Sequence, residues 1–266
     1  MKKKLTIFYL IFVVSVSAQT KIISWNIQDF GKTKTTETIE KIANITRDYD
    51  IIVLQEVVAG YGGTQAVAKL ADELNRKGSK WDYITSPKTK SPKYKTERYA
   101  FLWKTSKVKA IGRGRLLSEL EQEIYREPFL MDFEVNHNVF TILNYHSRKH
   151  DDNPSEEIKY LVDYLLAQDK AVILAGDFNT KQNAKVFQPL YKNGFVSILK
   201  NIKTTLKRKC KLGNYLSHPI DNMFLSQEKF TILKFGVIDF VKKCELLLQS
   251  RKISDHLPVT LTITLI

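Results

Sequence analysis

Polar residues follow several of the apolar runs in this chain, at or near the point where each run ends. In the stretch ILAGDFNT, apolar and small residues lead directly into Asp177 and Asn179. The other such residues are Asn26 after KIISW, Glu56 after IIVLQ, His146 after FTILNY, Asp221 within HPIDNMFLS, and Asp255 with His256 before LPVTLTITL. One aspartate or asparagine after a strand is usually a turn former, but the repetition here indicates a site. Ligand and catalytic groups commonly gather at strand ends in α/β sheets, so we expect these residues to converge.

The residue types in this set define the chemistry that the site could perform. The oxygen donors suit Mg²⁺, Mn²⁺ or Ca²⁺ rather than zinc. They are the carboxylates of Glu56, Asp177, Asp221 and Asp255 with the amides of Asn26 and Asn179. His146 and His256 can transfer protons near neutral pH, while His137, His150 and His218 are expected to be non-catalytic. The set therefore predicts metal-assisted hydrolysis of a phosphate ester.

The apolar runs themselves predict the elements that would position these groups. Short runs rich in β-branched and aromatic residues predict strands at 21–25, 51–54, 99–103, 139–144, 171–175, 220–225 and 257–263. Helical patterns lie between them at 36–48, 65–77 and 154–168. Alternation of strands with helices predicts one layered α/β domain over 19–266. The lysine-rich segments 88–95 and 200–211 are expected to be exposed basic loops.

The first eighteen residues and the overall charge bear on location and partners. Three lysines, an apolar run of about a dozen residues and the small residues of VSA predict a secretory signal peptide over 1–18. A membrane anchor is the alternative, but the run is shorter than the ~20 residues that a spanning helix needs. The formal charge is +14, and without the leader's lysines it remains strongly positive. Such a surplus favours polyanionic partners such as nucleic acid or an acidic lipid surface.

Cys210 and Cys244 are the only cysteines of the chain. In an exported protein they are expected to form a disulfide, which would stabilise the fold by about 4 kcal/mol through loop closure. Two free thiols are the alternative, and a zinc site lacks histidines at ligand spacing.

The motifs SWNIQ, VLQEV, LAGDFN and ISDHLP, in this order, resemble those of the endonuclease/exonuclease/phosphatase superfamily across nearly all of the mature chain. The segments NIQDFG, YKTERYAFLWK and YREPFLMDF are similar to the deoxyribonuclease I branch. The resemblance implies a four-layered α/β sandwich of two packed, mostly antiparallel sheets flanked by helices. It also implies a secreted, monomeric, divalent-metal-dependent endonuclease that hydrolyses DNA, with no protein partner and no membrane span in the mature chain.

The resemblance assigns a role to the residues that would surround the metal and the attacking water. Glu56, with Asp255 and Asn26 nearby, would hold Mg²⁺ or Mn²⁺, with Ca²⁺ as a further candidate. Asp177 and Asn179 would position the water and the phosphate.

The resemblance also assigns the proton transfers. His256 would accept the proton of water while Asp221 orients its ring. His146, oriented by Glu97, would donate to the phosphate or to the leaving oxygen. Arg126 would contact a backbone phosphate through its guanidinium.

Two positions depart from the branch, and both concern DNA binding. Val58 stands where the branch places a minor-groove arginine, and Tyr61 or backbone amides of the segment 59–64 could serve instead. Thr96 shifts the register of Tyr94, the residue expected to stack on DNA. The alternatives are a secreted, sphingomyelinase-like phosphodiesterase that acts on lipids, and a catalytically silent binding protein on the same fold.

Overall fold

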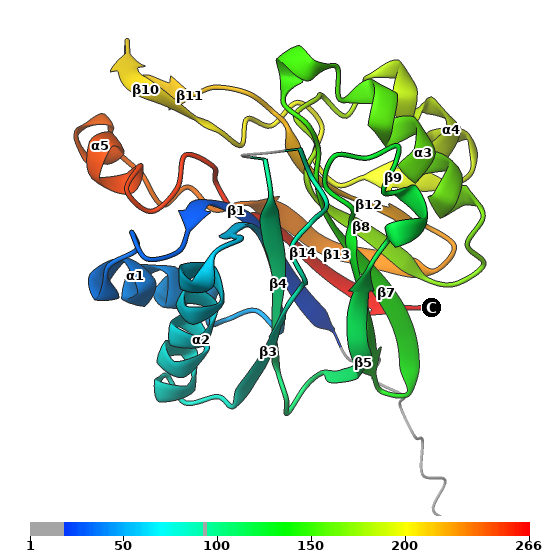
Figure 1. The fold of residues 1–266 in the computed structure, drawn as a ribbon, viewed down its shortest axis with the longest axis horizontal. Helices are drawn as coiled ribbons and strands as arrows, with labels where there is room; N and C mark the ends of the chain where they lie inside the picture. Colours follow the sequence, from blue (N-terminus) through cyan, green and yellow to red (C-terminus); the bar gives the residue numbers. More distant parts are fainter. Residues whose placement is uncertain (1–18, 93–94) are drawn as a thin grey trace, which may run out of the picture.

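Two six-stranded sheets pack face to face, and helices cover the outer face of each (Figure 1). The computed structural model describes residues 19–92 and 95–266. The expected leader 1–18 and Tyr94 lie outside the described residues. Every pairing within the sheets is antiparallel except β1 with β2 and β7 with β8. The four-layered, mostly antiparallel sandwich predicted from the resemblance is confirmed.

The first sheet contains strands from both ends of the chain. Its order is β13 (Phe230–Val237), β14 (Val259–Leu265), β1 (Thr20–Phe30), β2 (Ile51–Val58), β4 (Glu97–Lys104) and β3 (Trp81–Thr85). The second sheet has the order β5 (Lys109–Leu116), β6 (Phe129–Val135), β7 (Asn138–His146), β8 (Val172–Asp177), β12 (Asp221–Ser226) and β9 (Phe195–Ser197). A separate hairpin joins β10 (Leu206–Lys211) to β11 (Asn214–Leu216).

The helices lie outside the sheets. They are α1 (Thr36–Thr46), α2 (Tyr61–Arg76), α3 (Ser155–Leu166), α4 (Gln188–Lys192) and α5 (Leu247–Ser250). Short 3-10 turns occur at η1 (Ser118–Leu120), η2 (His150–Asp152), η3 (Lys185–Phe187) and η4 (Cys244–Leu246). The three predicted helices are confirmed, although α2 begins earlier than expected and takes in most of the segment 59–64. Among the described residues, no helix has the length and apolar character needed to cross a membrane.

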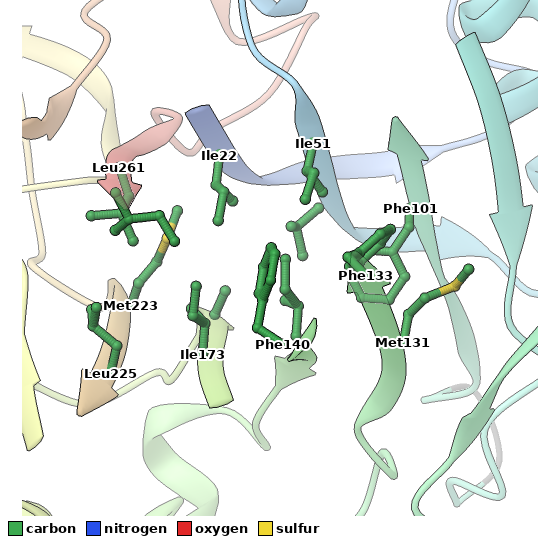
Figure 2. Close-up of a cluster of buried hydrophobic side chains, with 14 of the residues drawn as sticks. Ile22, Ile51, Phe101, Met131, Phe133, Phe140, Ile173, Met223, Leu225 and Leu261 are labelled. Carbon is green, nitrogen blue, oxygen red and sulfur yellow. The ribbon is translucent and has the colours of Figure 1, made fainter. Parts of the chain in front are cut away.

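Three apolar clusters separate the layers. The central cluster fills the space between the sheets, where Phe101 from β4 packs against Phe133 of β6 and Phe133 packs in turn against Phe140 of β7 (Figure 2). A second cluster joins the first sheet to α1 and α2, and a third joins the second sheet to α3 and α4. Burial of this apolar surface is the main force that holds the sheets together.

The alternation of strand side chains explains why polar residues lie at one edge of the central cluster. Successive side chains of a strand point to opposite faces. Asp177 follows Ile173 and Ala175 on the inner face of β8. His146 follows Phe140 and Ile142 on β7 in the same way. Asn26, Glu97 and Asp221 have the same even spacing from inward-facing core residues of β1, β4 and β12. The inner faces therefore change from apolar to polar at this edge.

The segment 200–211 differs from its predicted loop, because its second half forms β10 of the hairpin. The predicted disulfide is confirmed: Cys210 on β10 is bonded to Cys244 in η4, with Cα atoms 5.7 Å apart.

Candidate active site

His256 and Asp221 form a buried histidine–carboxylate pair. The Nδ1 atom of His256 lies 3.0 and 2.9 Å from the two carboxylate oxygens of Asp221. The Thr204 hydroxyl donates to Oδ2 of Asp221 at 2.6 Å and accepts from the backbone N–H of Asp221. A carboxylate on Nδ1 holds the proton there and leaves Nε2 of His256 free to accept another. This contact fits the orienting role predicted for Asp221, and the role itself stays a prediction.

His146 and Glu97 form a second pair of the same kind. The Nδ1 atom of His146 lies 2.9 and 3.1 Å from the oxygens of Glu97. Arg126 holds the backbone that carries His146: its Nε donates to the His146 carbonyl at 3.1 Å and its Nη2 donates to the Ser147 carbonyl. Its Nε also lies 3.6 Å from Glu97. These contacts position His146, and the predicted contact of Arg126 with a substrate phosphate stays a prediction.

Asp177 lies between the two pairs. Its Oδ2 atom is 3.6 Å from Nε2 of His146 and 3.8 Å from Nε2 of His256. The strand register fixes this arrangement, because Asp177 is directly opposite His146 on β7 and Asp221 on β12. The backbone N–H of Asn179, which has a left-handed φ of 47°, donates to Oδ1 of Asp177 at 2.9 Å. The two rings therefore face each other across one carboxylate.

Glu56 enters the site through a local break in β2. Strict alternation along β2 would place the Glu56 side chain on the outer face of the sheet, with Ile52 and Leu54. The backbone at Glu56 has a left-handed φ of 58°, and the register with β4 shifts between Leu54 and Val57. A bulge of this kind turns a side chain toward the other face and is often found at functional sites. The Glu56 carboxylate accepts from Asn26 Nδ2 at 3.0 Å and from the Asp29 N–H at 3.2 Å.

Asn26 connects the acids of the two sheets. Its Nδ2 donates to Oε1 of Glu56 and, at 3.1 Å, to Oδ2 of Asp177. Its Oδ1 is buried and accepts no hydrogen bond from the described residues. An unpaired buried oxygen beside two carboxylates is a suitable donor for a hard cation.

A cavity of about 630 Å³ opens over these groups, and we call it the catalytic cavity. Six acidic and three basic side chains line it. The acids are Asp29, Glu56, Glu97, Asp151, Asp177 and Asp255, and the bases are Lys95, Arg126 and Lys149. A cavity with this excess of carboxylates would repel an anionic substrate unless a cation balanced the charge. The residues present therefore fit a divalent metal ion.

Two groups of side chains could bind the metal. Ligand atoms of Asp177, Asp221 and His256 all lie within 4.8 Å of one another. However, Asp221 already accepts from Thr204 and contacts Nδ1 of His256, so its oxygens are occupied. Glu56 and Asn26 retain free oxygen lone pairs, and Asp255 lines the same cavity with its side chain 28% exposed. The second group matches the predicted metal residues and has the better donors.

The two histidines differ in their electrostatic surroundings. Burial lowers the pKa of His146 to about 4, and the Arg126 guanidinium acts in the same direction. For His256 burial also favours the neutral ring, but the Asp221 and Asp177 carboxylates outweigh it and raise the pKa well above its ordinary value. Burial raises the pKa of Glu97 to about 7. Burial and the adjacent Asp221 raise the pKa of Asp177.

These shifts reverse the protonation states that the predicted roles need, because a base must be neutral before it acts. When no cation balances the carboxylates, the raised pKa favours the protonated ring of His256 and the lowered pKa favours the neutral ring of His146. The field that raises the pKa of His256 comes from acids that border the proposed metal site, so a bound cation would oppose it.

Several supporting residues were not predicted from the sequence. The Ser254 hydroxyl donates to the Asn26 carbonyl at 2.6 Å and accepts from the His256 N–H at 3.0 Å. Trp25 Nε1 donates to the His256 carbonyl at 2.8 Å. These bonds tie the segment 254–257, which we call the catalytic segment, to the middle of β1. His150, expected to be non-catalytic, lines the catalytic cavity.

The sequence does contain a signal for Ser254, because this serine belongs to the ISDHLP motif that also carries Asp255 and His256.

The model of the endonuclease/exonuclease/phosphatase family matches residues 23–256, which include every described residue of the predicted site. The chain belongs to this family.

Proteins named deoxyribonuclease-1 are similar in sequence to part of this chain. The Bos taurus protein is 33% identical over 182 residues, which are 63% of each chain. The Homo sapiens protein is 34% identical over 176 residues, which are 60% of each chain. The matches span less than two thirds of these relatives' length. They confirm the predicted likeness to deoxyribonuclease I.

Solved structures of the family have the same fold. The endonuclease/exonuclease/phosphatase from Bacteroides vulgatus superposes with a TM-score of 0.66 at 14% identity, covering 94% of this chain and all of that one. D. rerio TDP2, solved with a single strand DNA product, gives 0.63 at 17% identity and covers 93% of this chain and 99% of its own. At these identities the likeness shows the fold alone.

Proposed function

We propose that this protein is a secreted, divalent-metal-dependent endonuclease that hydrolyses DNA phosphodiester bonds by in-line attack of water. The observation that carries the proposal is the pair of histidine–carboxylate groups facing each other across Asp177. Phosphodiester hydrolysis needs a base at the entering oxygen, an acid at the leaving oxygen and neutralisation of the phosphate charge. We assign these three tasks, in this order, to His256, to His146 and to a metal ion held by the acids beside Glu56.

Each proton transfer follows from the hydrogen bonds of the two rings. His256, with its Nδ1 proton held by Asp221, accepts a proton from water at Nε2. Asp177, between the two Nε2 atoms, positions this water with the help of Asn179. Glu97, whose pKa is raised to about 7, can hold a proton and donate it to Nδ1 of His146, so that the neutral ring carries its own proton on Nε2. From Nε2 His146, held by Glu97 and Arg126, donates to the leaving oxygen from the opposite side.

The metal would be held by Glu56 and Asp255, with the unpaired Oδ1 of Asn26 beside them. When bound, Mg²⁺ or Mn²⁺ would supply positive charge to the phosphate oxygens, and Ca²⁺ is a further candidate. Within the chain, the Asn26 amide keeps Glu56 and Asp177 together despite their like charges. Asn26→Ala should therefore weaken metal binding as well as the alignment of Asp177.

DNA is proposed as the substrate because the relatives are named deoxyribonucleases and because the chain is strongly basic. Arg126 and Tyr94 remain proposed DNA contacts. Tyr61 offers a further one, since it begins α2 close to Val58 and is 75% exposed. Export through the predicted signal peptide over 1–18 belongs to the same proposal.

One assay tests the function and its alternatives. The purified mature protein is incubated with supercoiled plasmid, with RNA and with sphingomyelin, each with Mg²⁺ and with EDTA. We expect nicking of plasmid that EDTA abolishes and that His256→Ala and Asp177→Ala each lower by roughly 10² to 10⁴-fold. Turnover of sphingomyelin alone would establish the lipid phosphodiesterase instead. No turnover of any substrate by the folded protein would establish the silent binding protein.

A further inference from the structure

A second cavity, of about 700 Å³, lies beside the catalytic cavity. The two share Asp255 and His256 in their linings. We call the second cavity the basic groove and the β10–β11 unit, Leu206–Leu216, the basic hairpin. The basic groove is lined by His256 and by residues of the basic hairpin, so a substrate bound at His256 would extend directly into the groove.

The basic groove has the opposite charge to the catalytic cavity. Its cationic lining residues are Lys207, Arg208, Lys209, Lys211 and Arg251. Its acid is Asp255, which lies 3.4 Å from Arg251 Nη2. Arg208, Lys209 and Lys211 are exposed and form no ion pair with the residues that the structure describes. Their charges are therefore available to an anionic partner.

The basic hairpin is held rigidly although it joins neither sheet. A two-stranded hairpin by itself is only marginally stable in water. Here the Cys210–Cys244 disulfide attaches it to η4, and Arg251 Nη1 donates to the Leu206 carbonyl at 2.8 Å. Leu206 also packs in an apolar cluster with Leu247 of α5. These contacts order an element that contributes none of the proposed catalytic groups.

The chain before the basic hairpin is bonded directly to the catalytic segment. Thr205 pairs with His256 as an isolated bridge, and the Leu206 N–H donates to the Asp255 carbonyl at 2.8 Å. The Leu257 N–H donates to the Thr204 carbonyl at 2.6 Å. These bonds hold the backbone at the start of the basic hairpin directly beside His256.

We propose that the basic groove binds the phosphate backbone of the nucleic acid on one side of the scissile bond. The inference rests on the proposed nuclease function and adds to it a binding surface outside the catalytic cavity. From Lys207 to Lys211 an extended strand spans about 13 Å. One strand of a DNA duplex carries roughly four phosphates over that axial length. The spacing of the cations therefore matches a backbone rather than a single phosphate group.

The test removes three exposed charges that have no role in the catalytic cavity. The variant carries Arg208→Gln, Lys209→Gln and Lys211→Gln. The matched control carries Lys69→Gln, Lys80→Gln and Lys107→Gln, which remove the same charge from exposed positions on α2 and in the turns beside β3 and β4. Binding of fluorescein-labelled duplex DNA is measured by anisotropy in EDTA over a series of KCl concentrations.

We expect the slope of log Kd against log salt to fall by about 2.7 in the groove variant, since each phosphate contact contributes about 0.9. Its affinity at low salt should be on the order of 10²-fold weaker. The control should bind with the wild-type slope, and both variants should hydrolyse bis(p-nitrophenyl) phosphate at the wild-type rate. Equal DNA binding by the groove variant and the control would overturn the inference.

A parallel titration with phosphatidylserine vesicles separates the two kinds of anionic surface. Loss of vesicle binding with unchanged DNA binding would overturn the inference in favour of a membrane contact. Because binding is measured in EDTA without turnover, it is independent of plasmid nicking. A wild-type protein that fails to nick plasmid refutes the proposed function, whereas unchanged DNA binding by the groove variant refutes the groove alone.

Discussion

Replacement of Asp221 by asparagine should inactivate the site without disturbing the fold. The Thr204 oxygen already accepts the N–H groups of Ile220 and Asp221, so its own proton is directed to Oδ2 of Asp221 at 2.6 Å. An asparagine satisfies this donor with its amide oxygen. Its NH₂ group then faces Nδ1 of His256, which lies 3.0 Å from the other oxygen position. His256 must accept at Nδ1 and carry its proton on Nε2, where it cannot receive one from water.

The rate should fall by roughly 10² to 10⁴-fold, the usual contribution of a positioned base. This range corresponds to about 3 to 5 kcal/mol of transition-state stabilisation. The direction of the pH effect follows from the raised pKa of His256, to which Asp221 contributes. Activity that needs the neutral ring rises with pH, and loss of Asp221 should move this rise to lower pH while the plateau falls.

The assay is initial rates of plasmid nicking in Mg²⁺ across a pH series, with thermal unfolding of each variant. Asp72→Asn, the same change at an exposed position of α2, is the control. An Asp221→Asn protein that unfolds at the wild-type temperature and nicks plasmid as fast as the control would refute the proposed orientation of His256 by Asp221.

Three further predictions concern stability and metal binding. Mg²⁺ at 100 times its Kd should stabilise the wild type by about 2.7 kcal/mol, and Glu56→Gln should abolish the matching rise in melting temperature. Reduction of the Cys210–Cys244 disulfide, which closes a loop of 34 residues, should cost about 4 kcal/mol in urea unfolding, and a reduced protein of equal stability would contradict this. The pKa of Glu97 is raised to about 7, so this residue stabilises the fold below its unfolded pKa and the stabilisation is lost as pH rises through 7. The pKa of His146 is lowered to about 4, so this residue stabilises the fold above its unfolded pKa and the stabilisation is lost as pH falls through 4. Glu97→Gln removes the first contribution, so its urea midpoint should rise more steeply than the wild type's between pH 4 and 6.5, and parallel curves would contradict the assignment.

The sequence predicts the site well where side-chain parity continues from the core. Asp177 and His146 each follow inward-facing apolar residues at even spacing, so the apolar pattern of the strand also specifies the direction of the polar group. The VLQEV motif predicts Glu56 as a site residue, but the alternation of side chains along β2 does not. The bulge at its left-handed backbone turns the side chain from the outer face of the sheet to the inner face. No periodic pattern reveals such a reversal.

Other features are hidden because their strands are not apolar. The strand LKRKCK of β10 carries mostly basic residues, which predict an exposed loop, and the strand KAIGRGRL of β5 is interrupted by two glycines and two arginines, so it has no apolar run. Pairing and the disulfide make β10 a strand despite its composition. Thr204 has no signal in the sequence at all, since its role depends on a contact with Asp221, 17 residues away.

Hydrogen bonds between the two sheets have a consequence for when the protein can work. Glu97 and Asn26 come from the first sheet, and their partners His146 and Asp177 come from the second. The catalytic segment that carries His256 leads into β14, which pairs with β1 from the opposite end of the chain. During synthesis the residues of β14 leave the ribosome after those of every other strand that the structure describes. A nascent chain in which residues 254–265 are not yet made lacks His256 and the strand that pairs with β1, so the candidate site cannot assemble before synthesis has passed them.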